Sequence, residues 1–409
     1  MPDFDWERPL KDLHELAELT GGPDGARRLA WSEDWRGARE WLLGKLAETD
    51  ATVERDVAGN LWATIPGERD EIVVVGSHID AVPHGGWLDG CLGILAAVEV
   101  LRAHKGSTPA VTLKLVDWAD EEGARFGRSL LGSSAAAGTL DPEAVRGLKD
   151  NQGIALPDAL KENGIDLDTM GAAELPEIAA YLELHIEQGP RLEEAGKPAA
   201  AVIGCFGVER HSITFTGKAS HAGSTPMNLR HDAFLSAARF GLAARESAIE
   251  RGGVATVGTV TADPGIPTII NRVCEVTLDQ RAFTPQQLVD MLADVKAAAA
   301  RIGDEEGVEV EWKRIWQIDP IPFDARLVDL AAQAVGEITG DEDPPRLPSG
   351  ALHDAAEVAR RYPTVMVFSS STNGVSHSPL EDTPEDDLRI ALRAYGRLYE
   401  LTAGMISAP

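Results

Sequence analysis

Apolar residues recur at three- and four-residue spacing near the start of the chain and then give way to short apolar runs. The first pattern covers Trp6–Leu19 and Ser32–Glu48 and is typical of amphipathic helices, with Ser32 placed to cap the second one. The short runs predict strands that are buried on both faces of a sheet. They are Ile72–Val75, Val111–Val116, Tyr181–Leu184 and Val365–Phe368. Helical stretches at Leu92–His104 and Pro384–Ala403 accompany these runs, so the pattern predicts an α/β sheet covered by helices.

The middle of the chain has a different rhythm. Its strand-like segments are Ser212–Thr216, Ala255–Val260, Val273–Leu278 and Val308–Trp312. Two amphipathic helices, Asp232–Arg251 and Pro285–Ile302, lie among them. The resulting β-α-β-β-α-β order resembles a ferredoxin-like unit of about 110 residues. We therefore expect a discontinuous α/β domain, formed by residues 1–208 and 326–409, that is interrupted by an inserted α+β domain at 209–325.

Histidines and carboxylates follow the apolar runs at four places. They are His78 with Asp80, Glu121 with Glu122, His185, and His377. In open α/β sheets ligands bind outside the carboxyl ends of the strands, so these groups can converge on one crevice. Imidazole and carboxylate ligands suit Zn, Mn, Co or Ni, and Asp89, in a glycine-rich loop, is the candidate bridge between two metals. The alternatives are structural histidines and a solvated acidic turn at Glu121-Glu122.

The net charge and the cysteine spacing exclude several classes of function. The chain has 38 Lys+Arg against 66 Asp+Glu, a net charge of −28, which argues against binding to nucleic acid or to a membrane surface. No apolar run approaches the ~20 residues that cross a bilayer, and the N-terminus lacks the features of a secretory signal. The three cysteines have no C-x-x-C spacing and predict neither a disulfide framework nor a thiolate zinc site. We therefore expect a cytoplasmic protein.

Seven motifs carry a specific resemblance. They are Ser77-His78-Ile-Asp80, Gly85-Gly-Trp-Leu-Asp89-Gly90, Glu121-Glu122-Gly-Ala-Arg125-Phe126, His185-Ile-Glu-Gln188-Gly189-Pro, Gly217-Lys-Ala-Ser-His221-Ala-Gly-Ser-Thr-Pro226-Met, Ser349-Gly350-Ala-Leu-His353-Asp354-Ala and Ser376-His377-Ser378-Pro379. Together they resemble the M20 metallohydrolases, and within them the branch of N-carbamoyl-L-amino-acid hydrolases, allantoate amidohydrolases and β-ureidopropionases. The resemblance runs from about Gly25 to Leu401.

The resemblance implies a di-metal catalytic domain, with a central mixed sheet flanked by helices, and an inserted ferredoxin-like dimerisation or lid domain. It implies two divalent metal ions per subunit, Zn or Mn, Co or Ni. The implied ligands are His78, the bridging Asp89, Glu122, His185 and His377. In this family pattern His78 and His185 bind different metals. Glu121 is the implied general base, and Asp80 is expected to hydrogen-bond the far nitrogen of His78.

The resemblance also implies substrate contacts. His221 would stabilise the oxyanion, reaching in from the partner subunit of a homodimer. Gln188 would contact the ureido group, Arg281 would hold the α-carboxylate of the substrate, and Gly350 and Ala351 would offer backbone groups. A turn residue at His221 and a surface arginine at 281 are the alternatives.

Two segments depart from the family pattern. Ala282-Phe283 follows Arg281 where many relatives have a polar residue, and the other departure lies before the arginine strand. The family commonly has an N-x-I-P-G segment before the arginine strand, whereas this chain reads Pro264-Gly-Ile-Pro267-Thr-Ile-Ile-Asn271. Pro267 takes the place of the usual Asn, and Asn271 falls where the Gly would be. Asn271 is therefore a candidate for a relocated polar substrate contact.

These expectations define a metal-dependent amidohydrolase. It would cleave the carbamoyl C–N bond of N-carbamoyl-L-amino acids by attack of a metal-bridging water, and its substrate would be a small ureido carboxylate. Allantoate amidohydrolase, β-ureidopropionase and an M20 aminoacylase or peptidase are alternatives of the same fold. An inactive carboxylate-binding relative is the alternative of a different class.

Overall fold

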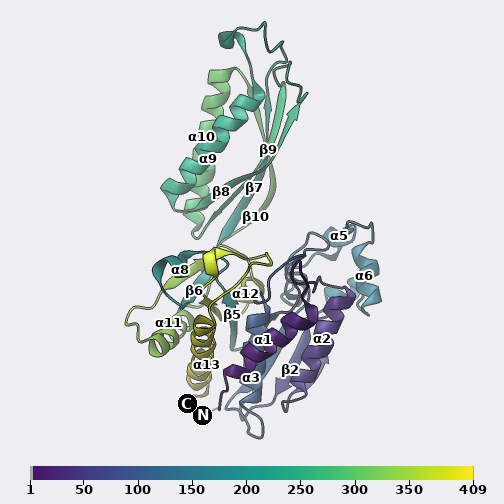
Figure 1. Ribbon diagram of the computed structural model, residues 1–409, viewed down its shortest axis with the longest axis vertical. Coiled ribbons are helices and arrows are strands. Elements are labelled where there is room, and N and C mark those ends of the chain that lie inside the picture. Colours follow the sequence, from purple (N-terminus) through teal and green to yellow (C-terminus); the bar gives the residue numbers. More distant parts are fainter. Residues whose placement is uncertain (1–2, 409) are drawn as a thin grey trace. The chain divides into compact units, whose positions relative to one another are not determined.

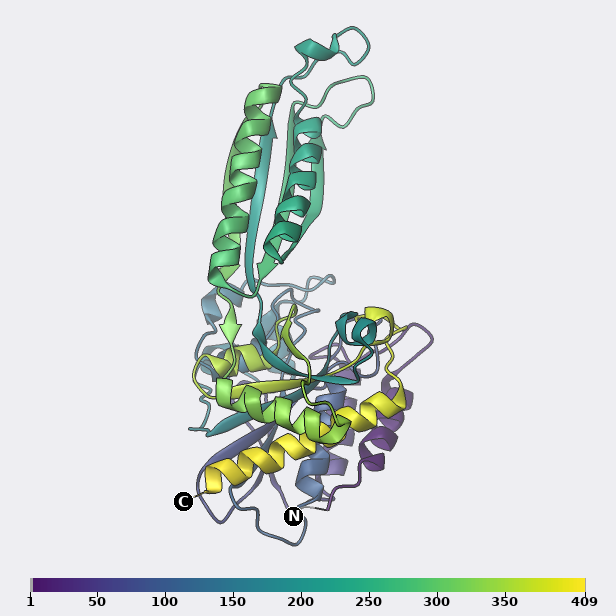
Figure 2. The same cartoon turned by 90° about the vertical axis from the view of Figure 1, so that its left-hand side faces the viewer.

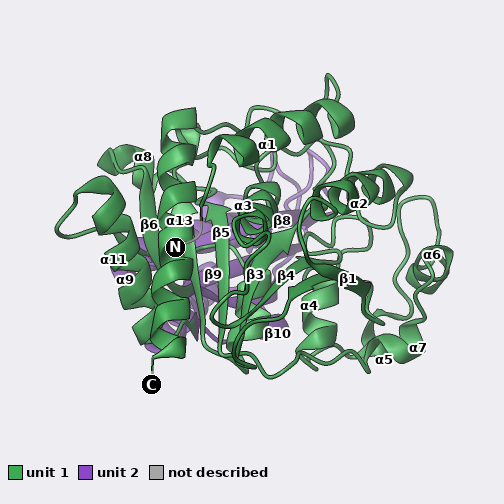
Figure 3. Cartoon of the chain, turned by 90° about the horizontal axis from the view of Figure 1, so that it is seen from below, with its two compact units in different colours: residues 1–204, 322–409 green, residues 205–321 purple. Residues whose placement is uncertain are grey.

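The computed structural model describes residues 3–408, which fall into two compact units (Figure 3). Unit 1 combines the residues up to Gly204 with those from Pro322 onward, and unit 2 is Cys205–Ile321. Each unit has its own sheet.

The sheet of unit 1 is mixed, with nine strands among the described residues, in the order β1-β2-β4-β3-β5-β13-β6-β11 and with β12 beside β6. The strands are β1 (Thr52–Arg55), β2 (Leu61–Ile65), β3 (Ile72–His78), β4 (Thr112–Trp118), β5 (Ala180–Ile186), β6 (Ala199–Cys205), β11 (Ile321–Pro322), β12 (Arg346–Ser349) and β13 (Thr364–Ser369). The neighbouring strands β4, β3, β5 and β13 are parallel, so their carboxyl ends meet at one edge of the sheet.

Helices cover this sheet, and every residue of β5 is buried although its side chains alternate between the two faces. The helices are α1 (Glu7–Thr20), α2 (Glu33–Leu46), α3 (Cys91–Arg102), α4 (Leu131–Ala136), α5 (Pro142–Val145), α6 (Leu156–Glu162), α7 (Leu167–Met170), α8 (Arg191–Ala195), α11 (Ala325–Thr339), α12 (Asp354–Ala359) and α13 (Glu385–Ser407). Ser32 caps α2, as predicted, and its hydroxyl accepts the N–H of Trp35 at 3.2 Å. Helix α3 packs on β3, β4 and β5 and is buried throughout, and α13 packs beside α11 (Figures 1 and 2).

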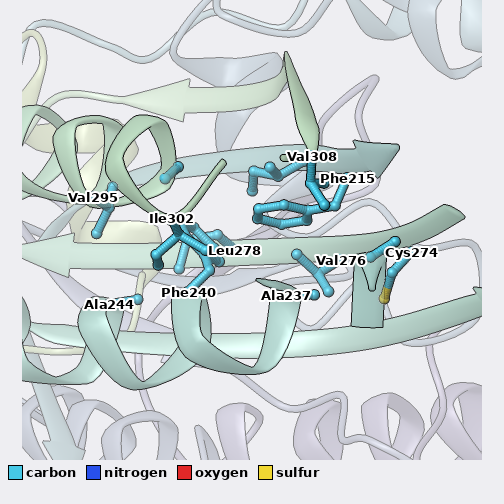
Figure 4. Packing of buried hydrophobic residues seen from close by; sticks show 13 residues of the cluster. Phe215, Ala237, Phe240, Ala244, Cys274, Val276, Leu278, Val295, Ile302 and Val308 are labelled. Atoms are coloured by element: carbon cyan, nitrogen blue, oxygen red, sulfur yellow. The ribbon is translucent and has the colours of Figure 1, made fainter. Parts of the chain in front are cut away.

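Unit 2 has an antiparallel sheet of order β10-β7-β9-β8 with two helices. In chain order its elements are β7 (Gly207–Thr216), the short η1 (Met227–Leu229), α9 (Ala233–Arg251), β8 (Val254–Asp263), β9 (Val273–Ala282), α10 (Pro285–Glu306) and β10 (Glu309–Ile318). Helices α9 and α10 lie side by side along the sheet (Figure 2), and the core between them and the strands contains Phe215, Phe240, Leu278, Val295 and Ile302 (Figure 4).

The predicted fold class is therefore confirmed: a mixed α/β sheet flanked by helices and a separate β-α-β-β-α-β unit. Several strand boundaries were wrong, since β9 and β10 continue to Ala282 and Ile318. Strand β7 begins at Gly207 and not at Ser212, and the polar residues Glu209 and His211, which are buried in the strand, interrupt the apolar pattern that would have predicted this start. Among the described residues, no helix is both long enough and apolar enough to span a bilayer.

Candidate metal centre

Several histidines and carboxylates lie at or after the carboxyl ends of the parallel strands of unit 1. Strand β3 ends at His78, β5 contains His185, Glu121 and Glu122 follow β4, and His377 follows β13. Because β3 and β5 are hydrogen-bonded neighbours, the rings of His78 and His185 lie with their centroids 5.8 Å apart.

Asp89 lies at the centre of these residues, in the loop before α3. Its Oδ1 is 3.2 Å from Nε2 of His185 and 3.6 Å from Nε2 of His78. Its Oδ2 is 3.3 Å from Nε2 of His377, and Oε2 of Glu122 is 3.4 Å from the same nitrogen. The described residues form three groups of potential metal ligands, and within each group the ligand atoms lie within 4.8 Å of one another. One is Glu183–His185–His353, and the other two are His78–Asp89–His185 and Asp89–Glu122–His377. Asp89 belongs to both of the latter groups.

The polar atoms that face Asp89 fit a pair of cations. Nε2 of His78, Nε2 of His185 and Oε1 of Glu122 are buried and have no hydrogen-bond partner. The other ring nitrogens lie close to backbone carbonyl oxygens, Nδ1 of His78 at 3.1 Å from that of Asp80 and Nδ1 of His185 at 2.9 Å from that of Ile186. These contacts assign the ring protons to Nδ1 and leave the Nε2 lone pairs available to a metal. Buried atoms without partners are costly, and divalent cations would satisfy them.

The grouping differs from the expectation that His78 and His185 bind different metals. Both rings face the same oxygen of Asp89. The reason is the strand order, because β3 and β5 are adjacent and parallel and present their final histidines side by side. His377 and Glu122 instead face the second oxygen of Asp89.

Burial and mutual repulsion perturb these carboxyl groups. Burial raises the pKa of Glu121 well above its ordinary value, and the nearby Asp354 and Glu122 raise it further against the opposing effect of His78. Burial and the Asp89 charge raise the pKa of Glu122 to about 7. Burial also opposes the ionisation of Asp89, but the neighbouring imidazoles of His185 and His377 outweigh it and hold the pKa of Asp89 well below its usual range.

Asp80 has a different set of contacts from the one expected. Its Oδ1 lies 3.6 Å from Nδ1 of His78, beyond hydrogen-bond distance, and its backbone oxygen takes that place. The two carboxylate oxygens accept the backbone N–H groups of Glu121 and Glu122, each at 3.2 Å. Asp80 therefore orients both acidic residues after β4.

Gln188 lies directly beside the shared carboxylate, with a backbone φ of 58°. Its Nε2 donates to Oδ2 of Asp89 at 2.9 Å and to Oγ of Ser376 at 3.1 Å. Gly350 and Ala351 follow β12, and the N–H of Ala351 donates to Oγ of Ser349 at 3.1 Å. The substrate contacts expected of these residues remain predictions.

The sequence interpretation missed two buried carboxylates next to this site. Glu183 lies two residues before His185 on β5 and accepts hydrogen bonds from Ser77 Oγ at 2.9 Å and Tyr181 Oη at 3.0 Å. Glu381 accepts the backbone N–H groups of Leu88 and Asp89 at 3.0 and 3.1 Å. The period of two along a strand is a signal for Glu183, whereas Glu381 follows the Ser376–Pro379 motif without a local pattern of its own.

The remaining predicted site residues belong to unit 2. His221 is exposed, and its Nδ1 accepts the backbone N–H groups of Gly223 and Ser224, both at 3.1 Å, which assigns the ring proton to Nε2. Oδ1 of Asn271 accepts the N–H of Gly265 at 3.0 Å and so closes the loop between β8 and β9. Nε of Arg281 donates to Asp279 at 2.9 Å. The roles of all three residues in substrate binding remain predictions.

At the strand ends of a helix-flanked α/β sheet, histidines and carboxylates gather around one aspartate, an arrangement that can hold divalent metal. The chain belongs to peptidase family M20/M25/M40, because the model of that family matches residues 74–401. The resemblance inferred from the motifs is therefore confirmed.

Individual relatives agree with this assignment. The chain is 37% identical to the N-carbamoyl-L-amino acid amidohydrolase of Geobacillus stearothermophilus, over 97% of this chain and 99% of that protein. It is 32% identical to the allantoate amidohydrolase of Bacillus subtilis, over 94% and 95% of the two chains. Among solved structures, an amidase of the hydantoinase/carbamoylase family from Burkholderia multivorans matches with a TM-score of 0.89, at 31% identity and 98% coverage of both chains.

Proposed function

We propose that this chain is an amidohydrolase that uses two divalent metal ions to cleave the carbamoyl C–N bond of N-carbamoyl-L-amino acids. The observation that carries the proposal is the position of Asp89, whose two oxygens each face a separate group of potential ligands. The relative named N-carbamoyl-L-amino acid amidohydrolase, which matches over nearly its whole length, supports the choice of substrate.

Bound divalent ions supply Lewis-acid chemistry and make water acidic enough to ionise near neutral pH. Glu121 is the proposed general base. Oε2 of Glu121 is 3.9 Å from Nε2 of His78, and the side chain is outside all three groups of ligands. The raised pKa of its buried carboxyl suits a group that accepts a proton from water and then delivers it to the leaving nitrogen. Asp80 keeps Glu121 and Glu122 in position through their backbone N–H groups.

The residues expected to contact the substrate complete the proposal. The Nε2–H of His221 would donate to the oxygen on which negative charge develops, and the contacts at Nδ1 keep that proton in place. The guanidinium of Arg281 would hold the substrate carboxylate, with Gln188, Asn271, Gly350 and Ala351 as further polar contacts. Hydrolysis of the ureido bond would yield ammonia, carbon dioxide and an L-amino acid.

The proposal includes a homodimer formed through unit 2. Strand β8 is at one edge of its sheet, where backbone N–H and C=O groups are open to a further strand. Val260 of β8 and Ile249 of α9, which packs on β8, are 54% and 66% exposed. A second copy that adds its own β8 would extend the sheet and cover these side chains. The doubly substituted V260K/I249K protein should be monomeric by light scattering, and a monomeric unsubstituted protein would contradict the dimer.

The test of substrate class is an assay of ammonia release. Protein stripped of metal and reloaded in parallel with Mn²⁺, Co²⁺, Ni²⁺ or Zn²⁺ is supplied with N-carbamoyl-L-amino acids, N-carbamoyl-β-alanine, allantoate and N-acetyl amino acids. We expect turnover of N-carbamoyl-L-amino acids that depends on metal. Preference for allantoate, the substrate in the name of a relative that is 32% identical, would replace the proposed substrate within the same chemistry. Cleavage of N-acetyl amino acids alone would overturn the proposal.

A further inference from the structure

Glu381 fills the space next to the loop that carries Asp89. The residue is 2% exposed, and its Oε1 accepts both the Leu88 and the Asp89 backbone N–H groups. A Cβ atom at Gly86 would lie 2.1 Å from the same oxygen, so the backbone at 86 approaches Glu381 as closely as only a glycine permits. The carboxylate of Glu381 is therefore in direct contact with the loop on both sides of Trp87.

The second oxygen of Glu381 competes with Asp89 for one proton. Oγ of Ser376 lies 2.9 Å from Oε2 of Glu381 and 3.2 Å from Oδ2 of Asp89. A serine hydroxyl has a single hydrogen and can donate to only one of these carboxylates at a time. The shorter distance favours Glu381. Gln188, whose Nε2 donates to both Ser376 and Asp89, uses an acceptor position of the same hydroxyl.

We infer that Glu381 is a positioning residue that draws the Ser376 proton away from Asp89. Oδ2 of Asp89, which accepts one hydrogen bond from Gln188, thereby keeps its second lone pair for the cation of the Asp89–Glu122–His377 group. This inference rests on the two-metal centre proposed above. It assigns Glu381 and Ser376 no contact with the cation. The two residues change metal affinity only through the hydrogen bonding of Asp89, and they do so at one of the two metal sites.

The substitution E381Q separates this role from simple loop support. The Gln oxygen can still accept the N–H groups of Leu88 and Asp89, but its NH₂ group replaces Oε2 and must donate to Ser376. The hydroxyl of Ser376 then turns to Oδ2 of Asp89 and competes with the metal. In a titration with Co²⁺ followed by its visible absorption, one of the two sites should weaken by about tenfold or more, as is typical of residues that orient metal ligands.

A second substitution supplies a rescue. In S376A/E381Q no hydroxyl proton remains, so the affinity of the weakened site should return close to that of the unsubstituted protein. S376A alone should also bind two Co²⁺ ions. The matched control is E357Q. Glu357 is likewise buried and accepts a hydrogen bond from the hydroxyl of Thr139 at 2.5 Å. It belongs to neither of the ligand groups that contain Asp89. E357Q should leave both affinities unchanged.

The outcomes distinguish this inference from the proposed function. An unsubstituted protein that binds fewer than two Co²⁺ ions would defeat the two-metal centre itself. Two ions in the unsubstituted protein and unchanged affinity in E381Q would overturn the role of Glu381 alone, and so would equal losses in E381Q and S376A/E381Q. If E381Q does not fold, E381D provides the test, since an aspartate accepts but cannot donate and should keep both sites. Loss of a site in E381D would overturn the inference.

Discussion

Arg39 and Asp117 form a buried ion pair in unit 1, with Nε of Arg39 2.7 Å from Oδ2 of Asp117. Arg39 belongs to α2 and also donates to the backbone oxygen of Asp117 at 3.0 Å. The other carboxylate oxygen of Asp117 accepts the N–H of Ile79, the residue after His78, at 2.9 Å. The pair therefore connects α2 to the ends of two strands that carry the candidate metal centre.

Replacement of Arg39 by methionine should destabilise the chain by about 3 kcal/mol, because it leaves the buried Asp117 without its partner. Burial already raises the pKa of Asp117 to about 6 against the effect of Arg39. The free energy of unfolding in urea checks this expectation. The control is R36M, in which the lost group is exposed and donates to Asn163 at 3.2 Å, and a cost in R39M no larger than in R36M would contradict the argument.

Replacement of Glu121 by glutamine should abolish turnover while metal binding stays nearly intact. The amide keeps the shape of the side chain but cannot accept a proton from water, and loss of a general base costs typically 10²–10⁴-fold in rate. Steady-state kinetics together with metal analysis of the same preparation test this. Activity above a few per cent would assign the base to another residue, and loss of metal would make Glu121 a ligand.

Replacement of His221 by asparagine should lower kcat by about 10²–10³-fold, the usual effect of removing one donor to an oxyanion. Since His221 is proposed to act on developing charge, KM should change much less. H231N is the control, because His231 is also an exposed histidine of unit 2. Nitrogen-15 NMR should show the His221 proton on Nε2, and a proton on Nδ1 would conflict with the two N–H groups that Nδ1 accepts.

His211 should make stability depend on pH. Burial and the positive charges of Arg314 and Lys296 lower the pKa of this β7 histidine to about 4, compared with roughly 6.5 in an unfolded chain. Between these values the unfolded chain binds a proton that the folded chain excludes, so stability falls as pH drops from about 6.5 to 4. Oε2 of Glu209, 3.7 Å from Nε2 of His211, is the acidic group that faces the ring.

The substitution H211F tests this contribution. The difference in unfolding free energy between pH 7 and pH 5 should be smaller in H211F than in the unsubstituted protein, whereas H231Q should retain the original difference. Equal pH dependence in all three proteins would show that His211 already takes up its proton in the folded state.

The strands and helices that the sequence predicted are those with a strong local pattern. The apolar runs of β3, β5 and β13 and the periodicity of α1 are enough to predict these elements without knowing which strands or helices they pack against. Strand β6, Ala199–Cys205, was not predicted because its small residues have no strand signature, and its pairing with β13 depends on the assembled sheet.

The candidate ligands were also readable, because each lies in a short motif at the end of an apolar run. Their grouping was not. That His78 and His185 face one oxygen of Asp89 follows from the adjacency of β3 and β5, which no spacing along the chain expresses. Glu381 could not be predicted for the same reason, because the Asp89 backbone N–H from which it accepts a hydrogen bond is 292 residues away in the chain.

The contact between Gly86 and Glu381 also constrains how this chain can change. A side chain at position 86 collides with the carboxylate of Glu381, while a shorter residue at 381 would open a space that glycine does not fill. The two positions are therefore free to vary only together. In an alignment of relatives, substitutions at these two positions should therefore be correlated, although one lies in the loop before α3 and the other in the segment after β13.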